Sequence, residues 1–189
     1  MDSGAQCAFS AKSGSRREKG LPSGWPWAIM GIIYQYEVYV MTIHDELNLT
    51  MLCDFYELTM GQGYFAHGYQ DRITYFDLFF RRCPDGGGFA IAAGLEQIVQ
   101  YIQRLHFSDE DIAYLRGRNL FSEEFLTYLR NFKFTGDIWA VPEGTPVFPR
   151  EPIITVRAPA IQAQLIETYL LLCVNHQSLI ATKANRVIR

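Results

Sequence analysis

The stretch FFRRCPDGGGFAIAAGLEQ, residues 79–97, joins two arginines to three consecutive glycines and then to an apolar segment. A phosphate loop of the Walker type needs the pattern GxxxxGK(S/T), and this stretch has no such lysine. A dinucleotide-binding loop needs GxGxxG between a strand and a helix, whereas these glycines lie between two strand-like segments, 73–82 and 89–93. We therefore predict a hairpin turn at CPDGGG, with glycine supplying positive φ, and keep a phosphate cradle as the alternative.

The paired arginines before this turn bear on the same question. Successive side chains of a strand point to opposite faces, so at most one of Arg81 and Arg82 would point inward. The planar guanidinium of that one could bind a phosphate or a carboxylate. The stretch alone leaves a phosphate-handling function open.

Working outward toward the N-terminus, a helix is predicted just before the first strand. Asp54 and Glu57 have the spacing of a capping box at its start. Gly68 fits its end, because glycine readily takes the left-handed conformation that closes a helix. The chain then enters the strand predicted over 73–82.

Toward the C-terminus, the pattern predicts more helices and a second group of strands. Apolar residues at helical spacing predict a helix over 95–105, and Ser108 and Ser122 each fit the N-cap of a further helix. Residues 137–159 combine β-rich runs with prolines and glycines, which predicts two or three strands. From Pro159 to the last residue there is no glycine or proline, so we predict one long helix over 159–189.

Composition and charge bound the class of protein. The chain has 189 residues, 49% of them hydrophobic and 20% charged, which suffices for one sizeable core. The net charge of −3 and the pI near 5.8 give no electrostatic footprint for nucleic acid. The four cysteines lack the spacing of a zinc site and are expected to be reduced thiols of a cytoplasmic protein.

The first 40 residues differ from the rest. Residues 1–24 are polar and locally basic, and residues 27–40 form an apolar run that Gln35 and Glu37 interrupt. This run is shorter than the roughly 20 residues that cross a bilayer, so no membrane association is expected. We predict a disordered extension over 1–40, an N-terminal α/β domain over 41–158 and the long helix over 159–189.

Four stretches taken together resemble nicotinate phosphoribosyltransferase, in that family's order and spacing, from about residue 48 to residue 189. They are CDFYELTMGQGYF, FDLFFRRCPDGGGFAIAAGLEQ, WAVPEGTPVFPREPIITVRAP and QLIETYLLLCVNHQSLIATKANRVIR. The resemblance implies the α/β fold of a type II phosphoribosyltransferase, with an N-terminal α+β domain followed by an irregular α/β barrel. Here the barrel would be mostly missing, since the long helix that leads into it stops at Arg189.

The resemblance also implies a reaction. The family joins nicotinate to phosphoribosyl pyrophosphate, giving nicotinate mononucleotide and pyrophosphate in NAD salvage, with ATP hydrolysis assisting and usually with Mg²⁺. It implies a homodimer in which the N-terminal region of one subunit completes the neighbour's active site. The 189-residue chain alone is expected to be inactive. The alternative is a non-catalytic remnant, or a domain that only dimerises.

Two places carry the resemblance to candidate substrate-binding residues. The motif D-x-Y-x-x-T matches Asp54, Tyr56 and Thr59, and the family's tyrosine stacks on the pyridine ring held by the partner subunit. Without the resemblance, Asp54 reads as a helix cap and Tyr56 as a core residue. In ATKANRVIR, Lys183 and Arg186 lie three apart on one helix face and are implied to face substrate phosphates. A solvated helix end is the alternative there.

Overall fold

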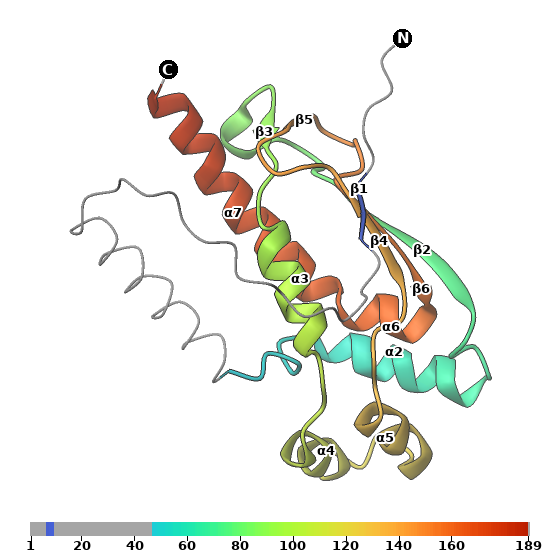
Figure 1. Ribbon diagram of the computed structural model, residues 1–189. Coiled ribbons are helices and arrows are strands. Elements are labelled where there is room, and N and C mark those ends of the chain that lie inside the picture. Colours follow the sequence, from blue (N-terminus) through green and yellow to red (C-terminus); the bar gives the residue numbers. More distant parts are fainter. Residues whose placement is uncertain (1–6, 10–46, 189) are drawn as a thin grey trace, which may run out of the picture. The chain divides into compact units, whose positions relative to one another are not determined.

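The computed structural model describes residues 7–9 and 47–188. By its internal contacts the chain divides into two units, one of residues 1–10 and 50–189 and one of residues 11–49. The fold given below is that of the first unit (Figure 1).

Antiparallel strands form two sheets in this unit. The larger sheet has four strands in the order β1-β4-β6-β2, and the smaller one pairs β3 with β5. Along β6, buried and half-buried residues alternate with the period of a strand, so Ile154, Val156 and Ala158 face the core. The strands are β1 (Cys7–Phe9), β2 (Ile73–Leu78), β3 (Ala90–Ile91), β4 (Asp137–Ala140), β5 (Pro146–Val147) and β6 (Ile154–Pro159).

One helix packs directly on the larger sheet, and the other helices extend the fold beyond it. The helices are α2 (Phe55–Ala66), α3 (Leu95–Arg104), α4 (Asp109–Arg116), α5 (Glu123–Arg130), α6 (Ala160–Leu165) and α7 (Glu167–Ile188). Helix α6 packs on β2 and β6, and α2 packs on α6. Leu58, Phe125 and Ile161 are fully buried where these layers meet, and each such side chain contributes about 1.5–3 kcal/mol. The mixed α/β class predicted from the sequence is confirmed.

The predicted hairpin at CPDGGG is wrong. Strand β2 pairs along its length with β6, from Ile73 opposite Pro159 to Leu78 opposite Ile154, while β3 pairs with β5. The glycine run therefore joins two different sheets, through the 3-10 turn η1 (Pro84–Gly86), and Gly86 has a φ of +65°. The reason is that β6 offers β2 a ladder of six residues with one buried face, which a two-residue return strand cannot match.

The pairing of β2 with β6 also changes the prediction made for Arg81 and Arg82. Strand β2 ends at Leu78, so Arg81 and Arg82 lie in irregular chain and both are exposed. The expected alternation of their side chains between two faces does not apply. Backbone contacts hold this segment instead, with the Arg150 N–H donating to the Phe80 carbonyl at 2.8 Å.

Strand β1 lies in the segment 1–40, for which the sequence predicts no place in the fold. Its residues pair with β4, with Ala8 opposite Trp139. At these residues the structure differs from the expectation, because the edge of β4 presents backbone groups that an extended segment can pair with. The rest of the segment up to residue 40 lies outside the described residues, and the boundaries predicted at 40 and 158 stay predictions.

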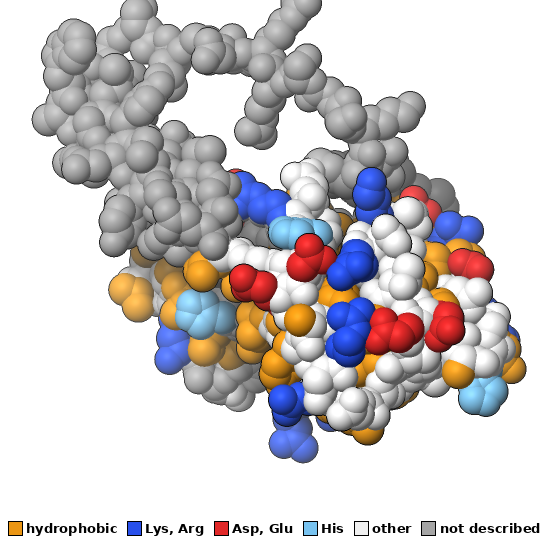
Figure 2. All heavy atoms as spheres, turned by 90° about the horizontal axis from the view of Figure 1, so that it is seen from below, with side chains coloured by type: hydrophobic (Ala, Val, Ile, Leu, Met, Phe, Trp, Pro, Cys, Tyr) orange, Lys and Arg blue, Asp and Glu red, His pale blue; other side chains and the backbone are white. Residues whose placement is uncertain are grey.

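The predicted caps of α4 and α5 are confirmed. Ser108 and Asp111 form a reciprocal capping box, with N–H to oxygen distances of 3.1 and 2.8 Å, and Ser122 caps α5. Two ion pairs join these helices, Arg116 to Glu123 and Arg130 to Asp109. Seen from below, acidic and basic side chains are intermixed on this side of the molecule (Figure 2).

The single long helix predicted over 159–189 is divided in two. Helix α6 ends at Leu165, α7 begins at Glu167, and Pro159 is the last residue of β6 rather than part of a first turn. The Thr168 N–H donates to the Glu57 carboxylate of α2 at 3.0 Å. This carboxylate caps a new helix, α7, and α6 ends before it. In the part of the chain that is described, α7 included, no helix has the length and apolar run needed to span a bilayer.

Candidate functional site

The stretch 79–97 is anchored on the second half of α7 by hydroxyl groups. The Ile91 N–H donates to the Thr182 Oγ1 at 2.9 Å, and the Ala93 N–H donates to the Ser178 Oγ at 3.1 Å. Ser178 and Thr182 are both buried and lie four residues apart on one face of α7. These bonds hold the stretch 79–97 beside α7, although the two are far apart in the sequence.

Gly94 allows the closest approach in this region. Its φ is +107°, and a Cβ there would lie 2.9 Å from the Cys173 carbonyl oxygen. Its N–H and that of Leu95 both donate to the Glu143 Oε1, at 2.7 and 2.8 Å. Glu143 therefore caps α3 from a distant loop, and only glycine fits between α3 and α7 without strain.

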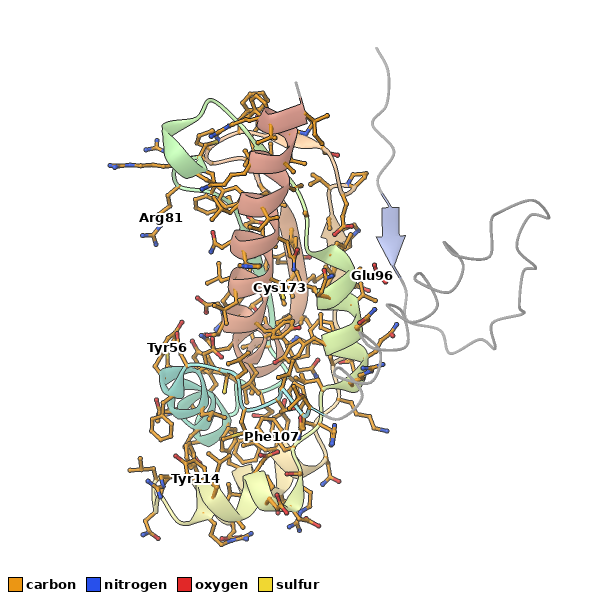
Figure 3. All side chains as sticks on the ribbon, turned by 90° about the vertical axis from the view of Figure 1, so that its left-hand side faces the viewer. Tyr56, Arg81, Glu96, Phe107, Tyr114 and Cys173 are labelled. Atoms are coloured by element: carbon orange, nitrogen blue, oxygen red, sulfur yellow. The ribbon has the colours of Figure 1, made fainter. Side chains whose placement is uncertain are left out.

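The C-terminal end of α7 meets the glycine run itself. A side chain at Gly87 would collide with the guanidinium of Arg186, so Arg186 lies directly against this turn. Lys183 and Arg186 are both exposed on the last turns of α7, and Arg81 and Arg82 are exposed on the loop before the turn. Figure 3 shows Arg81 on one side of α7, beside its C-terminal half. A guanidinium can bind an anion, and the implied role of Lys183 and Arg186 toward substrate phosphates stays a prediction.

The other end of α7 meets the first turn of α2. Glu57 is fully buried there, and its Oε1 accepts from the Thr168 N–H at 3.0 Å and from the Thr168 hydroxyl at 2.7 Å. The Asp54 N–H in turn donates to the Thr168 Oγ1 at 3.2 Å. The predicted capping box of Asp54 and Glu57 is therefore wrong: Asp54 is the N-cap residue by backbone geometry, but Glu57 caps α7 rather than α2.

Tyr56 is exposed at this junction and is in contact with Glu167, the first residue of α7. Its side chain is 45% exposed, and its phenol donates to the Glu167 carboxylate. The Gln164 Nε2 donates to the Oε2 of the same carboxylate at 3.0 Å. The Thr59 hydroxyl bonds only within the helix, to the Tyr56 carbonyl at 3.1 Å. Tyr56 thus offers a ring face to the surroundings while its hydroxyl is tied to α7.

Burial and neighbouring charge shift the pKa values at this junction. Burial raises the pKa of Glu57 to about 7, and the bonds from Thr168 oppose that rise. Glu167 and Asp54 add to the rise because like charges disfavour ionisation. Burial and the Glu167 carboxylate raise the pKa of Tyr56 to about 12, so its phenol stays protonated at neutral pH. Tyr56 is therefore suited to stacking and hydrogen-bond donation, not to nucleophilic attack.

The structure does not bring all the predicted site residues together. Asp54, Tyr56 and Thr59 lie at the start of α7, whereas Lys183 and Arg186 lie at its end. The 22 residues of α7 correspond to roughly 33 Å at the rise of an α-helix. The two groups of residues are therefore two separate candidate sites on this chain.

Sequence reasoning missed Glu57, Glu167 and Thr168 as parts of the junction. Glu57 was assigned to a capping box because that spacing is a strong local signal. Its partner Thr168 lies 111 residues away, and no local pattern reports such a contact. Among the described residues, no group of three or more His, Cys, Asp or Glu side chains is placed to hold a metal ion.

Comparisons with known proteins identify the fold and its family. Residues 51–175 match the model of the nicotinate phosphoribosyltransferase N-terminal domain. A nicotinate phosphoribosyltransferase of Mycobacterium tuberculosis is 44% identical over 138 residues, which cover 73% of this chain and 30% of the relative. The Bacillus subtilis enzyme is 44% identical over 140 residues, covering 74% and 29%. The crystal structure of human nicotinic acid phosphoribosyltransferase matches with a TM-score of 0.66 and 38% identity, over 70% of this chain and 27% of that one.

By these matches, residues 51–175 form the N-terminal domain of a phosphoribosyltransferase. The chain belongs to the nicotinate phosphoribosyltransferase family, a family of enzymes. It spans about 30% of the length of the curated relatives that it matches.

Proposed function

We propose that this chain is part of a nicotinate phosphoribosyltransferase, which forms nicotinate mononucleotide and pyrophosphate from nicotinate and phosphoribosyl pyrophosphate. The observation that carries the proposal is the exposed Tyr56 ring, with its hydroxyl tied to Glu167 at the start of α7. A ring held at its polar end presents an apolar face on which a planar pyridine can stack. Beside Tyr56, the Asp54 N–H donates to the Thr168 Oγ1, and the Thr59 hydroxyl donates to the Tyr56 carbonyl.

The separation of the two candidate places supports a site shared between two copies. Tyr56 and Arg186 lie at opposite ends of a 22-residue helix, farther apart than one mononucleotide can reach. In a homodimer, Tyr56 of one copy could stack on nicotinate while the basic groups near Arg186 of the other attract substrate phosphates. Mutual completion of two sites requires the two-fold arrangement that most homo-oligomers adopt.

ATP and Mg²⁺ belong to the proposal only through the family resemblance. The described residues offer no cluster of ligands suited to a metal ion, so no step is assigned through Mg²⁺ or ATP. A cytoplasmic setting is likewise proposed, and it agrees with free thiols at Cys53, Cys83 and Cys173.

The test is an assay for nicotinate mononucleotide with two proteins. One is the 189-residue chain alone, which we expect to be inactive. The other is the whole chain continued by the remaining part of the Bacillus subtilis relative, which is 44% identical over the shared region. We expect this fusion to be active, and Tyr56→Ala to raise the KM for nicotinate at least tenfold because stacking is lost. Tyr56→Phe is the matched control, since it keeps the ring.

A folded fusion that makes no nicotinate mononucleotide would contradict the proposal. So would an active fusion in which Tyr56→Ala leaves the KM for nicotinate unchanged. Product formed by the 189-residue chain alone would contradict the expectation that further residues are needed.

A second candidate is a domain that binds a copy of itself and catalyses nothing. Helix α7 favours it by exposing Leu172, Ile180 and Val187, at 50, 52 and 85%. Sedimentation of the 189-residue chain tests it. A dimer that Leu172→Glu with Ile180→Glu converts to monomer, together with an inactive fusion, would favour this second function.

A further inference from the structure

The junction between α2 and α7 contains two adjacent polar pairs. Tyr56 pairs with Glu167, and Glu57 pairs with Thr168, so two neighbours on one helix bond two neighbours on the other. We infer that Glu57 is a positioning residue: by capping the first turn of α7 it holds Glu167 against the Tyr56 phenol and so sets the direction of the Tyr56 ring. Only the catalytic consequence of this inference rests on the function proposed for Tyr56.

The first step is the cap itself. The chain breaks between α6 and α7 at Ile166 without a glycine or proline, and the Thr168 N–H at this break points to the Glu57 Oε1. A carboxylate at a helix N-terminus satisfies free N–H groups and interacts favourably with the helix dipole. Glu57 therefore determines where α7 begins and which way its first residue, Glu167, is presented.

The second step is the closure of the network. The Thr168 hydroxyl accepts from the Asp54 N–H while it donates to Glu57, so the start of α2 and the start of α7 are tied together. The Gln164 Nε2 fixes the Glu167 carboxylate from the α6 side at 3.0 Å. With both ends fixed, the phenol of Tyr56 has a fixed acceptor, which limits rotation of its ring.

The third step separates this role from that of an ordinary structural cap. Glu143 caps α3 through two N–H bonds in the same manner, but it lies at an exposed position away from Tyr56. Glu57 is fully buried, and among the described residues its Oε2 has no hydrogen-bond partner. An amide could accept the same bonds from Thr168, so the carboxylate adds only its charge to the junction.

That charge is felt across the junction. The titratable groups that face Glu57 are Asp54 on its own helix, Glu167 on α7, Tyr101 on α3 and Cys53 on the chain before α2. Burial raises the pKa of Glu57 to about 7, so its ionisation changes near neutral pH. When Glu57 ionises it repels Glu167, and the contact between Glu167 and Tyr56 must respond.

The test follows Tyr56 directly, without an assay. The 189-residue chain is labelled with 3-fluorotyrosine, and Tyr56→Phe identifies the Tyr56 resonance among the 11 tyrosines. We expect this fluorine resonance to shift as the pH passes through neutrality. Glu57→Gln keeps an acceptor for both bonds from Thr168 and removes the charge, so it should hold the resonance near its low-pH position and abolish its pH-dependent shift. The matched control is Glu143→Gln, which removes a capping carboxylate elsewhere and should leave the Tyr56 resonance titrating as before.

Thr168→Val keeps the inference falsifiable if Glu57→Gln fails to fold. It removes the hydroxyl that Glu57 and Asp54 share and should displace the Tyr56 resonance, whereas Thr127→Val on α5 should not. A Tyr56 resonance that still titrates in Glu57→Gln overturns the inference. Loss of this titration in Glu143→Gln overturns it as well, because the effect would then be general loosening.

Kinetics of the fusion separate this inference from the proposed function. If Tyr56 stacks on nicotinate and Glu57 positions it, Tyr56→Ala and Glu57→Ala both raise the KM for nicotinate, because Glu57→Ala removes the acceptor for Thr168, and Glu143→Ala does not. If Tyr56→Ala raises that KM tenfold and Glu57→Ala leaves it unchanged, positioning by Glu57 is contradicted. If Tyr56→Ala itself changes nothing, the function of Tyr56 fails while the fluorine result still decides the role of Glu57.

Discussion

The two ends of α7 are both joined to the fold by polar contacts, but with different chemistry. At the N-terminal end, a buried carboxylate of α2 accepts from Thr168, and its pKa is raised to about 7. Along the C-terminal half, the neutral hydroxyls of Ser178 and Thr182 hold the segment around β3, and Gly94 allows close contact. One junction can change charge near neutral pH and the other cannot. The contacts of Ser178, Thr182 and Gly94 are called the neutral junction below, and those of Glu57 with Thr168 are called the ionisable junction.

Gly94→Ala tests the neutral junction and has the largest expected effect. It combines a left-handed backbone with a clash against the Cys173 carbonyl, so we expect a loss of about 4 kcal/mol in the free energy of unfolding. Gly68→Ala is the control, because its φ is +72° but nothing lies near the added Cβ. It should cost about 1 kcal/mol. Urea unfolding followed by circular dichroism measures both, and equal losses would show that the α3–α7 contact is loose.

Glu57→Gln tests the ionisable junction between α2 and α7. Folding raises the pKa of Glu57 from 4.5 to about 7, so the folded state binds the proton more tightly than the unfolded state. The free energy of unfolding that this group contributes therefore falls as the pH rises from 4.5 to 7 and is level above 7. The change is on the order of 3 kcal/mol, because each pKa unit corresponds to about 1.4 kcal/mol.

The measurement is the difference in free energy of unfolding between the original chain and Glu57→Gln at several pH values. Other carboxyl groups titrate in both proteins and cancel in this difference. A difference that stays constant from pH 4.5 to 7.5 would show that Glu57 does not titrate as its burial requires. The two junctions would then be alike in their chemistry.

Thr182→Val tests the hydroxyl contacts of the neutral junction. It preserves shape but leaves the Ile91 N–H without its acceptor, so we expect a loss of about 2 kcal/mol that does not vary with pH. Thr127→Val on α5 is the control, since that hydroxyl donates to the Glu123 carbonyl at an exposed position. It should change stability by less than about 0.5 kcal/mol. A pH-dependent loss in Thr182→Val would mean that this end is coupled to a titrating group.

Local sequence patterns predicted much of this fold but none of its long-range joints. The capping box of Ser108 and the helix over 95–105 follow from residues three to ten positions apart, and both are confirmed. The hairpin at CPDGGG failed because glycine content indicates a turn but not which strands it joins. The pairing of β2 with β6 depends on a buried ladder that forms only when the whole sheet is assembled.

The candidate site shows the same limit. The motif of Asp54, Tyr56 and Thr59 was found through resemblance, and its contacts with α7 could not be read from spacing. No glycine or proline marks the break at Ile166 in the sequence. We attribute this break to the Glu57 carboxylate of α2, which accepts from the Thr168 N–H. Burial and partnership of a charged group are properties of the assembled fold, so local patterns report neither.

The smallest expected effect separates two residues that look alike in sequence, Asp54 and Ser108. Both are N-cap residues, but only Ser108 accepts a capping bond, from the Asp111 N–H at 3.1 Å. Ser108→Ala should cost about 1 kcal/mol. Asp54→Ala should cost about 0.5 kcal/mol through the helix dipole, and above pH 7 less still, because removing its charge eases ionisation of Glu57. Thermal unfolding at pH 6 and pH 8 measures both. A loss from Asp54→Ala that equals that from Ser108→Ala at either pH would assign the α2–α7 junction to the Asp54 side chain rather than to Glu57, and the contrast between the two ends of α7 would need another origin.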